Sequence, residues 1–326
     1  MARVLKQRIP DTNISMLIQR YTAELVEGHR DIENVICYDE NDHPVSFFKL
    51  MSILRNQKFN IVFHTHPRFR LALITWFAGI PIRVGTGYRW YSFLFNRKVY
   101  EHRKHVVHHE LEYNLHLLNE IGCAADGLDV TPSIDVPDDI TKRVDKILKN
   151  KGVNETDKFI ILHPGSGGSA RNWSTQNFSE LGKRLTQLPD LKIIITGGKG
   201  EQSLVESVTA IIGEEAISLV NMLTLRELCA LAKRSSLFIA NSTGPIHIAA
   251  AVGTPVVGFY SQIPVMSSKR WGPYTQRKTI FTPKDKPIDC KKCVGAKDGS
   301  CECMDSISVD EVYQTAVKML MSDSKN

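Results

Sequence analysis

The sequence lacks an apolar run long enough to cross a membrane. The longest run, residues 71–82, is about half of the roughly 20 residues that a spanning helix needs, and Gly79 and Pro81 interrupt it. Residues 1–10 carry cations with no apolar core behind them, so they lack the hydrophobic region of a secretory signal. We therefore expect a cytoplasmic protein with no transmembrane helix.

A basic tail is also missing, and so is a stripe of alternating cations and aromatics. With 41 lysines and arginines against 35 aspartates and glutamates, the net charge is only +6 over 326 residues, and we expect no nucleic-acid partner. The densest basic stretch lies within residues 83–104, where Tyr88 and Trp90 stand among the cations. Such a stretch suits anionic lipid headgroups or phosphorylated sugars, and it equally suits a solvated rim over buried aromatics.

Internal repeats and low-complexity segments are absent, so the chain is an ordinary globular one of about two domains. Short apolar runs alternate with amphipathic helical patterns, which is typical of α/β architecture with parallel sheets. The pattern predicts helices at 45–55, 69–78 and 109–121. It predicts strands at 14–19, 34–38, 60–64, 82–85, 159–163, 192–196, 216–220, 237–240, 255–259 and 279–281.

A segment rich in proline, glycine and acids, residues 126–139, is the best candidate linker. We expect an N-terminal domain of residues 1–150, which includes this linker, and a C-terminal domain of residues 151–326. Two α/β halves joined in this way leave a cleft, and ligands of open α/β sheets bind beyond the carboxyl ends of the strands.

Three motifs of the second half lie at such strand ends. In HPGSGGSARNW, residues 163–173, a buried strand enters a loop whose backbone amides can bind an anion, and Arg171 adds a charge suited to a diphosphate. The alternative is a tight turn that needs glycine. In TGGKGEQSLVE, residues 196–206, Glu201 could accept the hydroxyls of a ribose, or it could simply favour the first turn of a helix.

The third motif is NSTGPIHIAAAVGTPVVGFYS, residues 241–261, in which the turn at Ser242, Thr243 and Gly244 offers hydroxyls and backbone donors. Pro245 lies early in a helix of small residues, and His247 faces either the cleft or the packed interior. Together the three loops indicate a site for a nucleoside diphosphate derivative in the second half.

These motifs resemble those of glycosyltransferase family nine, the ADP-heptose:lipopolysaccharide heptosyltransferases. The resemblance extends to FNIVFHTHPRFRLALITWFAGIPIRVG, residues 59–85, and so covers nearly the whole chain. It implies a GT-B fold with two Rossmann-like domains facing a cleft. It also implies inverting transfer of heptose to a lipid-anchored core oligosaccharide at the inner face of the cytoplasmic membrane, by an enzyme bound peripherally to that anionic surface. We expect no cofactor.

The resemblance carries over to individual residues of the donor site. A hydroxyl, a basic residue and an acid hold the diphosphate and ribose, the Thr-Gly-x-x-His pattern closes the site, and one residue lines the adenine. Family members usually have aspartate where this chain has Ser242, which leaves a different nucleotide-sugar donor open. The donor residues so implied are Ser166, Gly167, Arg171, Glu201, Met222, Ser242, Thr243, Gly244 and His247.

The catalytic base is the main departure from the family pattern. Family members open with a strand and a Gly-Asp loop that carries the base, whereas this chain begins in what looks like the following helix, residues 2–10. A start placed too far downstream and a non-catalytic, sugar-nucleotide-binding homologue are both open explanations. His64 and His66, expected on one face at a strand end, are candidate bases or acceptor ligands, and Arg68 and Arg89 are candidate acceptor-binding residues.

Four of the seven cysteines form a cluster at Cys290, Cys293, Cys301 and Cys303. A CxxC pair followed by CxC has the ligand types of a four-thiolate zinc site, although the two pairs are closely spaced. Reduced thiols that pack a loop, or a disulfide, are the alternatives. We expect no metal here.

Overall fold

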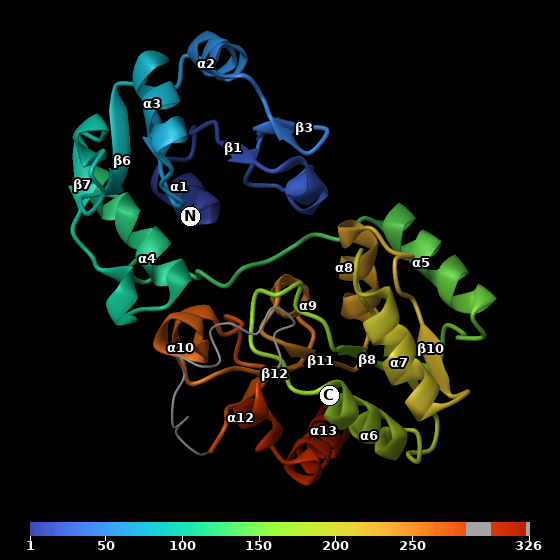
Figure 1. Cartoon of the computed structure of the whole chain (residues 1–326). Helices are drawn as coiled ribbons and strands as arrows, with labels where there is room; N and C mark the ends of the chain where they lie inside the picture. The colour runs from blue at the N-terminus through green and yellow to red at the C-terminus, as the bar shows by residue number, and fades with distance from the viewer. Residues whose placement is uncertain (285–300, 324–326) are drawn as a thin grey trace. The chain divides into compact units, whose positions relative to one another are not determined.

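The computed structural model describes residues 1–284 and 301–323 (Figure 1). The chain forms two compact units, Met1–Val130 and Thr131–Asn326. This division lies within the expected linker but ahead of the expected boundary at residue 150. Helix α5 (Asp138–Asn150) packs against α8 (Leu225–Arg234) and buries Ile140, Val144 and Leu148, so it belongs to the second unit.

The second unit is built on one parallel sheet of six strands in the order β10-β9-β8-β11-β12-β13. With β8 as the first strand of the unit, this is the doubly wound order 3-2-1-4-5-6. All six strands predicted in this half are confirmed, with small shifts at their ends. Their bounds are β8 Lys158–His163, β9 Leu191–Ile195, β10 Ala216–Ser218, β11 Leu237–Asn241, β12 Val256–Phe259 and β13 Lys278–Phe281.

Helices cover both faces of this sheet, which is why its central strands read as continuous apolar runs. One face packs with α6 (Thr175–Leu185), α7 (Gln202–Ile212) and α13 (Val309–Asp323), and Trp173 and Phe178 are at the centre of that core. Strand residues that point the other way, such as Ile161 and Phe238, are also fully buried. The helices nearest that second face are α5, α8 and α9 (Gly244–Ala251).

Local sequence signals explain where several of these helices begin and how closely they pack. Thr224 and Glu227 form a capping box at the start of α8, and Pro245 stands in the first turn of α9. On α6, a Cβ at Gly182 would come within 2.3 Å of Ile212 Cδ1, so glycine allows α6 and α7 to approach. Shorter elements complete the unit: η5 Pro264–Met266, α10 Ser268–Trp271 and α12 Glu302–Asp305.

The first unit contains parallel strands in two separate pieces and a short hairpin. The three-stranded piece has the order β5-β6-β7, β1 pairs with β2, and β3 pairs with β4. The strands of the first unit are β1 Ser15–Ile18, β2 Asn34–Cys37, β3 Asp39–Glu40, β4 His43–Pro44, β5 Ile61–Phe63, β6 Ile82–Thr86 and β7 Arg97–Val99. Its helices are α1 Ala2–Arg8, η1 Arg20–Leu25, α2 Phe47–Asn56, α3 Phe69–Phe77, η2 Ser92–Leu94, η3 Arg103–His105, α4 Glu110–His116 and η4 Leu117–Ile121.

Two small apolar cores hold most of these pieces together. Leu50 and Leu54 of α2 pack with Ile74 of α3, and α1 packs its Val4 and Leu5 into a second core around α4 and η4. The expected strands and helices of this half are present. Over the ranges that the structure describes, no helix combines the length and apolar character that a membrane span requires.

Candidate nucleotide-binding site

The three glycine-containing motifs of the second half follow strands that are neighbours in the sheet. Strand β8 lies between β9 and β11, and all three are parallel, so the loops after them meet at one edge. This edge is the switch point of the strand order, where ligands of open α/β sheets bind. The predicted donor residues follow these strands: Ser166, Gly167 and Arg171 after β8, Glu201 after β9, Met222 after β10, and Ser242, Thr243, Gly244 and His247 after β11.

The side chain of Asn241, the last residue of β11, holds both ends of the loop after β8. Its Nδ2 donates to the carbonyl of Pro164 at 2.7 Å, and its Oδ1 accepts from the backbone N–H of Trp173 at 2.8 Å. Trp173 is itself fixed, because its indole donates to the carbonyl of Ile307 at 3.0 Å and stacks on Phe259. One buried amide therefore fixes the span of the loop.

The carboxylate of Glu201 connects the middle of this loop to the loop after β9. Its oxygens accept from the backbone N–H of Gly167 at 3.1 Å and from that of Gly198 at 2.8 Å. A Cβ at Gly165 would lie 2.0 Å from Oε1 of Glu201, so a larger residue at position 165 would displace the carboxylate from its present place. The contact with ribose that we expect of Glu201 would add to these two bonds, since each carboxylate oxygen can accept more than one donor.

His163, at the end of β8, lies beneath the same two loops. Its Nδ1 is 2.9 Å from Oγ1 of Thr196, and its Nε2 is 3.9 Å from Oε2 of Glu201. Burial lowers the pKa of His163 to about 4, although the Glu201 carboxylate acts in the opposite direction. The imidazole is therefore neutral at pH 7, and its approach to Glu201 is not an ion pair.

Several polar groups of the site are suited to an anion. The Oγ of Ser166 is buried, and within residues 1–284 and 301–323 it has no hydrogen-bond partner. The backbone at Gly167 and Gly168 turns through positive φ angles of 55° and 77°, which favours glycine. Arg171 follows in the same loop and is only 8% exposed, so solvent screens its charge weakly.

The remaining predicted donor residues lie around this loop. The amide of Ser242 donates to the carbonyl of Phe259 and extends the sheet, while its side chain is paired with Tyr260. Thr243 precedes α9, and His247, one turn inside that helix, is half-buried. Met222 follows β10 and is 44% exposed, so it offers an apolar surface at the same edge.

Sequence reasoning gave no role to Asn241, Trp173, His163 or Thr196. Each lies at the end of a strand or loop, within a motif in which the predicted binding residues are others. A polar residue that ends a fully apolar strand was the available signal, because such a side chain is buried and has to find a partner. Which partner it finds depends on tertiary packing.

In the first unit, the structure separates the two histidines that were expected on one face. Strand β5 ends at Phe63, so the alternation of side chains stops before His64, which is buried, while His66 is exposed. The expectation of a shared face is therefore wrong. The hydroxyl of Thr75 donates to the carbonyl of Ala72, so it accepts from Nε2 of His64, 3.1 Å away.

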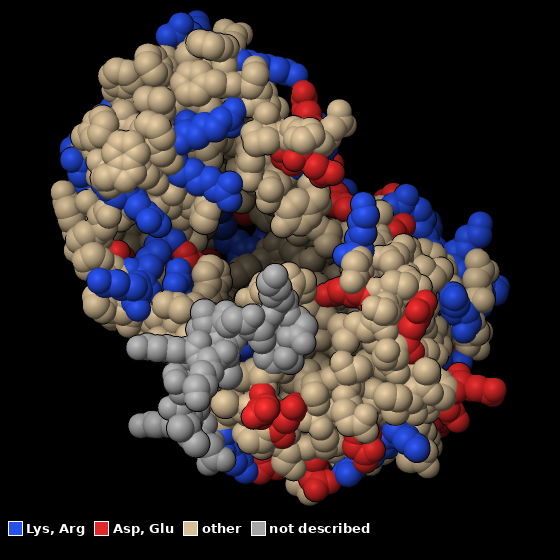
Figure 2. Space-filling view, viewed as in Figure 1, with Lys and Arg blue, Asp and Glu red and all other residues tan. Residues whose placement is uncertain are grey.

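The two histidines also differ in their electrostatic surroundings. Burial lowers the pKa of His64 to about 4, with a further contribution from the charge of Arg83. The pKa of His66 is lowered first by partial burial and then by nearby arginines, among them Arg68 and Arg89. The predicted acceptor residues thus gather around His66, on a unit whose visible surface carries many lysine and arginine side chains (Figure 2).

The cysteine cluster is described only in part. Cys290 and Cys293 lie outside the described residues, so the four-thiolate hypothesis stays open. Cys301 and Cys303 are half-buried and lie on either side of the start of α12.

Comparison with known proteins gives the class of the molecule. A family model described as glycosyltransferase family 9 (heptosyltransferase) matches residues 47–299. A putative glycosyltransferase of Haemophilus influenzae is 26% identical over 275 residues, 83% of this chain and 80% of its own length. A lipopolysaccharide heptosyltransferase 3 of Escherichia coli is 23% identical over 265 residues, 78% of this chain and 76% of its own.

A solved structure agrees with the fold. The E. coli ADP-heptose lipopolysaccharide heptosyltransferase II superposes with a TM-score of 0.79 at 18% identity, over 99% of this chain and 94% of that one. The fold is thus the GT-B fold of nucleotide-sugar transferases, as expected. The chain belongs to glycosyltransferase family 9, the heptosyltransferase family.

We expect Asn241→Ala to destabilise the second unit. The substitution leaves the N–H of Trp173 and the carbonyl of Pro164 buried without a partner, and each such loss costs about 1–3 kcal/mol. Urea unfolding followed by tryptophan fluorescence, to which the buried Trp173 contributes, measures this change. The matched control is Asn34→Ala, at an exposed hydrogen bond of the first unit, and an equal loss in the two variants would contradict the role given to Asn241.

We also expect the second unit to lose stability in acid. His163 is neutral when folded, with a pKa of about 4, but binds a proton in the unfolded chain near the ordinary value of about 6.5. Unfolding therefore takes up a proton below pH 6.5, and the free energy of unfolding falls as the pH falls from 6.5 toward 4. His163→Gln should show a shallower decline between pH 7 and pH 5 in the same urea experiment. A decline as steep as that of the unmodified chain would refute this origin.

Proposed function

We propose that this chain transfers a heptose from ADP-heptose to the inner core of lipopolysaccharide, with inversion at the transferred carbon. The observation that carries the proposal is the buried hydroxyl of Ser166, which has no hydrogen-bond partner among the described residues and lies in a glycine loop at the switch point of a Rossmann-type sheet. Membership in the heptosyltransferase family supports the sugar, and a relative named lipopolysaccharide heptosyltransferase 3 supports the acceptor.

The second unit would bind the donor and stabilise the leaving group. As the bond to the sugar breaks, negative charge develops on the diphosphate, and preorganised donors in a weakly solvated site stabilise that charge. We assign this role to Arg171, to the hydroxyl of Ser166 and to the amides at the start of α9. Gly167 would line the donor site, while its own amide stays bonded to Glu201. Glu201 would accept the ribose hydroxyls, and Met222 would contact the adenine.

The first unit would bind the acceptor. His64 is a poor general base at neutral pH, because its pKa of about 4 is far below the useful range and its Nε2 already donates to Thr75. His66 has arginine neighbours and suits an anionic ligand better than a proton to be abstracted. We therefore assign His66, Arg68 and Arg89 to anionic groups of the acceptor, and we assign no residue as the base.

The same unit would contact the anionic inner face of the cytoplasmic membrane. Trp90, Phe93 and Tyr100 are 73%, 69% and 63% exposed, and they belong to the basic stretch 83–104. Exposed aromatics among cations are the combination that binds an anionic interface, since the rings enter the headgroup region and the cations bind the lipid charge.

A second candidate uses the same fold with another nucleotide-sugar donor. Its support is Ser242, which stands where family members usually carry aspartate and whose side chain is paired with Tyr260. A donor panel separates the two candidates, since only one sugar should sustain turnover. Binding of ADP without transfer from any donor would indicate a non-catalytic, sugar-nucleotide-binding homologue.

The transfer reaction itself is the first test. We expect release of ADP from ADP-heptose that depends on a heptose-deficient lipopolysaccharide acceptor. Arg171→Ala should weaken ADP binding roughly ten- to hundredfold, because a hydrogen bond to a charged group is worth about 1.5–3 kcal/mol. Lys183→Ala, which removes an exposed charge from α6, is the matched control and should bind ADP normally. Unchanged ADP affinity in Arg171→Ala would refute the phosphate site.

Membrane contact is tested with vesicles. The double variant Trp90→Ala with Phe93→Ala should sediment less with vesicles that contain phosphatidylglycerol, because it loses the interfacial aromatics. Binding of the unmodified chain should weaken at high salt, which screens the cations. Phe48→Ala removes another aromatic of the first unit, 75% exposed on α2 outside the basic stretch, and should leave sedimentation unchanged. Equal binding to neutral and anionic vesicles would contradict the assignment.

A further inference from the structure

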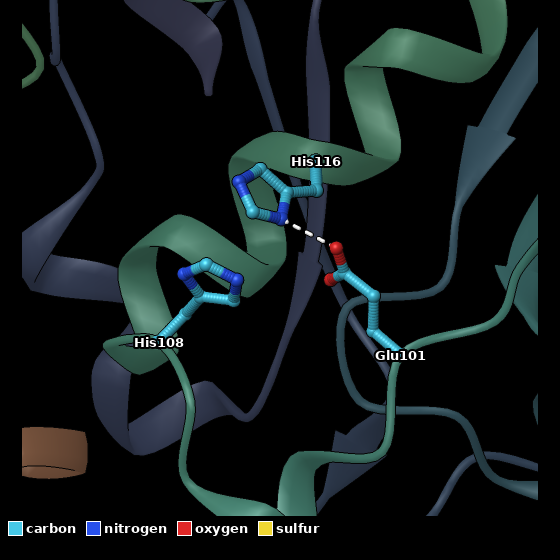
Figure 3. Close-up of side chains that lie close together, drawn as sticks. All are labelled: Glu101, His108 and His116. Carbon is cyan, nitrogen blue, oxygen red and sulfur yellow. Dashed lines mark hydrogen bonds and ion pairs between the residues drawn. The ribbon is translucent and has the colours of Figure 1, made fainter.

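Three metal-ligating side chains, none of them assigned to the acceptor, converge in the first unit (Figure 3). Glu101 lies in the loop after β7, His108 lies just before α4, and His116 is the last residue of that helix. One ligand atom from each lies within 4.8 Å of the other two. The fold therefore brings two imidazoles and a carboxylate to one point, from both ends of a helix and a separate loop.

Hydrogen bonds inside the described structure leave part of this cluster unexplained. His116 Nδ1 lies 2.8 Å from Oε1 of Glu101, which accounts for one carboxylate oxygen. The other oxygen, Oε2, is buried and has no hydrogen-bond partner among the described residues. The ring of His108 meets that of His116 edge to face, with centroids 5.0 Å apart. A hydrogen bond between His116 and Glu101 alone explains neither the position of His108 nor the burial of the second carboxylate oxygen.

We propose that Glu101, His108 and His116 bind a divalent transition metal of the zinc type. Imidazole nitrogen and carboxylate oxygen are ligands that zinc accepts, at about 2.0–2.2 Å, and three protein ligands leave a fourth tetrahedral position for water. Two ligand atoms on such an ion are roughly 3.4 Å apart, so the cluster has to contract by about 1.4 Å at most. His108 can supply this movement, because its side chain is 41% exposed and precedes the helix.

The neighbouring charges leave the carboxylate available to the ion. Arg103, the nearest cation along the loop, is paired with Glu110 and donates to Asn114 at 3.0 Å. Glu112 lies 3.8 Å from Nδ1 of His108 and adds negative charge on the same side. The site is also distinct in chemistry from the cysteine cluster, since it contains no thiolate.

A bound ion would join Glu101 and His108, which lie in the loop 100–109, to His116 at the end of α4. That loop contains Val106, a buried β-branched residue at φ 50°, which is an unfavourable region for such a side chain. A crosslink between Glu101 and His108 would hold this strained loop in place. The role that follows from the geometry is structural: the ion fixes the loop next to the arginine-rich surface around His66.

Zinc binding by an untagged, chelator-treated full chain tests this proposal. We expect one zinc equivalent to bind at this site in calorimetry and to raise the melting temperature. His108→Ala and His116→Ala should each weaken that binding by more than roughly 100-fold, the upper range for loss of an outer-sphere partner. His43→Ala, an exposed histidine on the β3–β4 hairpin, is the matched control and should bind zinc normally.

Cobalt distinguishes this site from the cysteines. Co²⁺ bound to nitrogen and oxygen ligands gives ligand-field bands alone, whereas thiolate ligands add intense charge-transfer bands. We expect ligand-field bands that disappear in His108→Ala. Zinc affinity unchanged in both histidine variants, spectra with only thiolate bands, or no bound metal would each overturn the proposal.

A conservative variant keeps the test independent of folding. Glu101→Gln retains the size of the side chain and an oxygen that can accept from His116, but it removes the charge. We expect it to melt like the unmodified chain without metal and to gain less from added zinc. A gain equal to that of the unmodified chain would count against Glu101 as a ligand.

Discussion

The buried side-chain amide of Asn241 is the interaction on which the candidate nucleotide site depends. It reaches across the switch point between β11 and β8 and bonds to both ends of the glycine loop, so the loop cannot change its span without breaking a buried bond. The sheet order explains why one residue can do this: β8 and β11 are neighbours in space although three helices and two strands separate them in sequence. The shape of the candidate anion-binding loop thus rests on a tertiary contact.

A second layer of polar bonding ties this loop to the rest of the sheet edge. Glu201 accepts from amides of two loops, and neutral His163 lies below it with Thr196 as its partner. Burial keeps the imidazole uncharged, so the site carries a carboxylate and the guanidinium of Arg171 without a third charge between them. Hydrogen bonds within the protein hold this edge in place, and a preorganised site of this kind would lower the entropic cost of binding the diphosphate that we propose.

Much of this architecture could be predicted because its signals are local. Apolar runs located all six strands of the second sheet, and the Thr224–Glu227 spacing located the start of α8. The residues and boundaries that the sequence did not predict depend mainly on contacts between residues distant in sequence. Helix α5 belongs to the second unit because its apolar face packs on α8. His64 and His66 do not share a face because β5 ends at Phe63. The role of Asn241 was missed because its partners lie about seventy residues away in the sequence.

The closeness of Gly165 to Glu201 has a consequence for how such a sequence can vary. Any side chain at position 165 would occupy the space that the carboxylate now fills, and a shorter residue at position 201 would leave the amides of Gly167 and Gly198 without their acceptor. The two positions are therefore coupled through the place of one carboxylate. A substitution at one of them changes the surroundings of the other, so we expect residues 165 and 201 to vary together among related sequences.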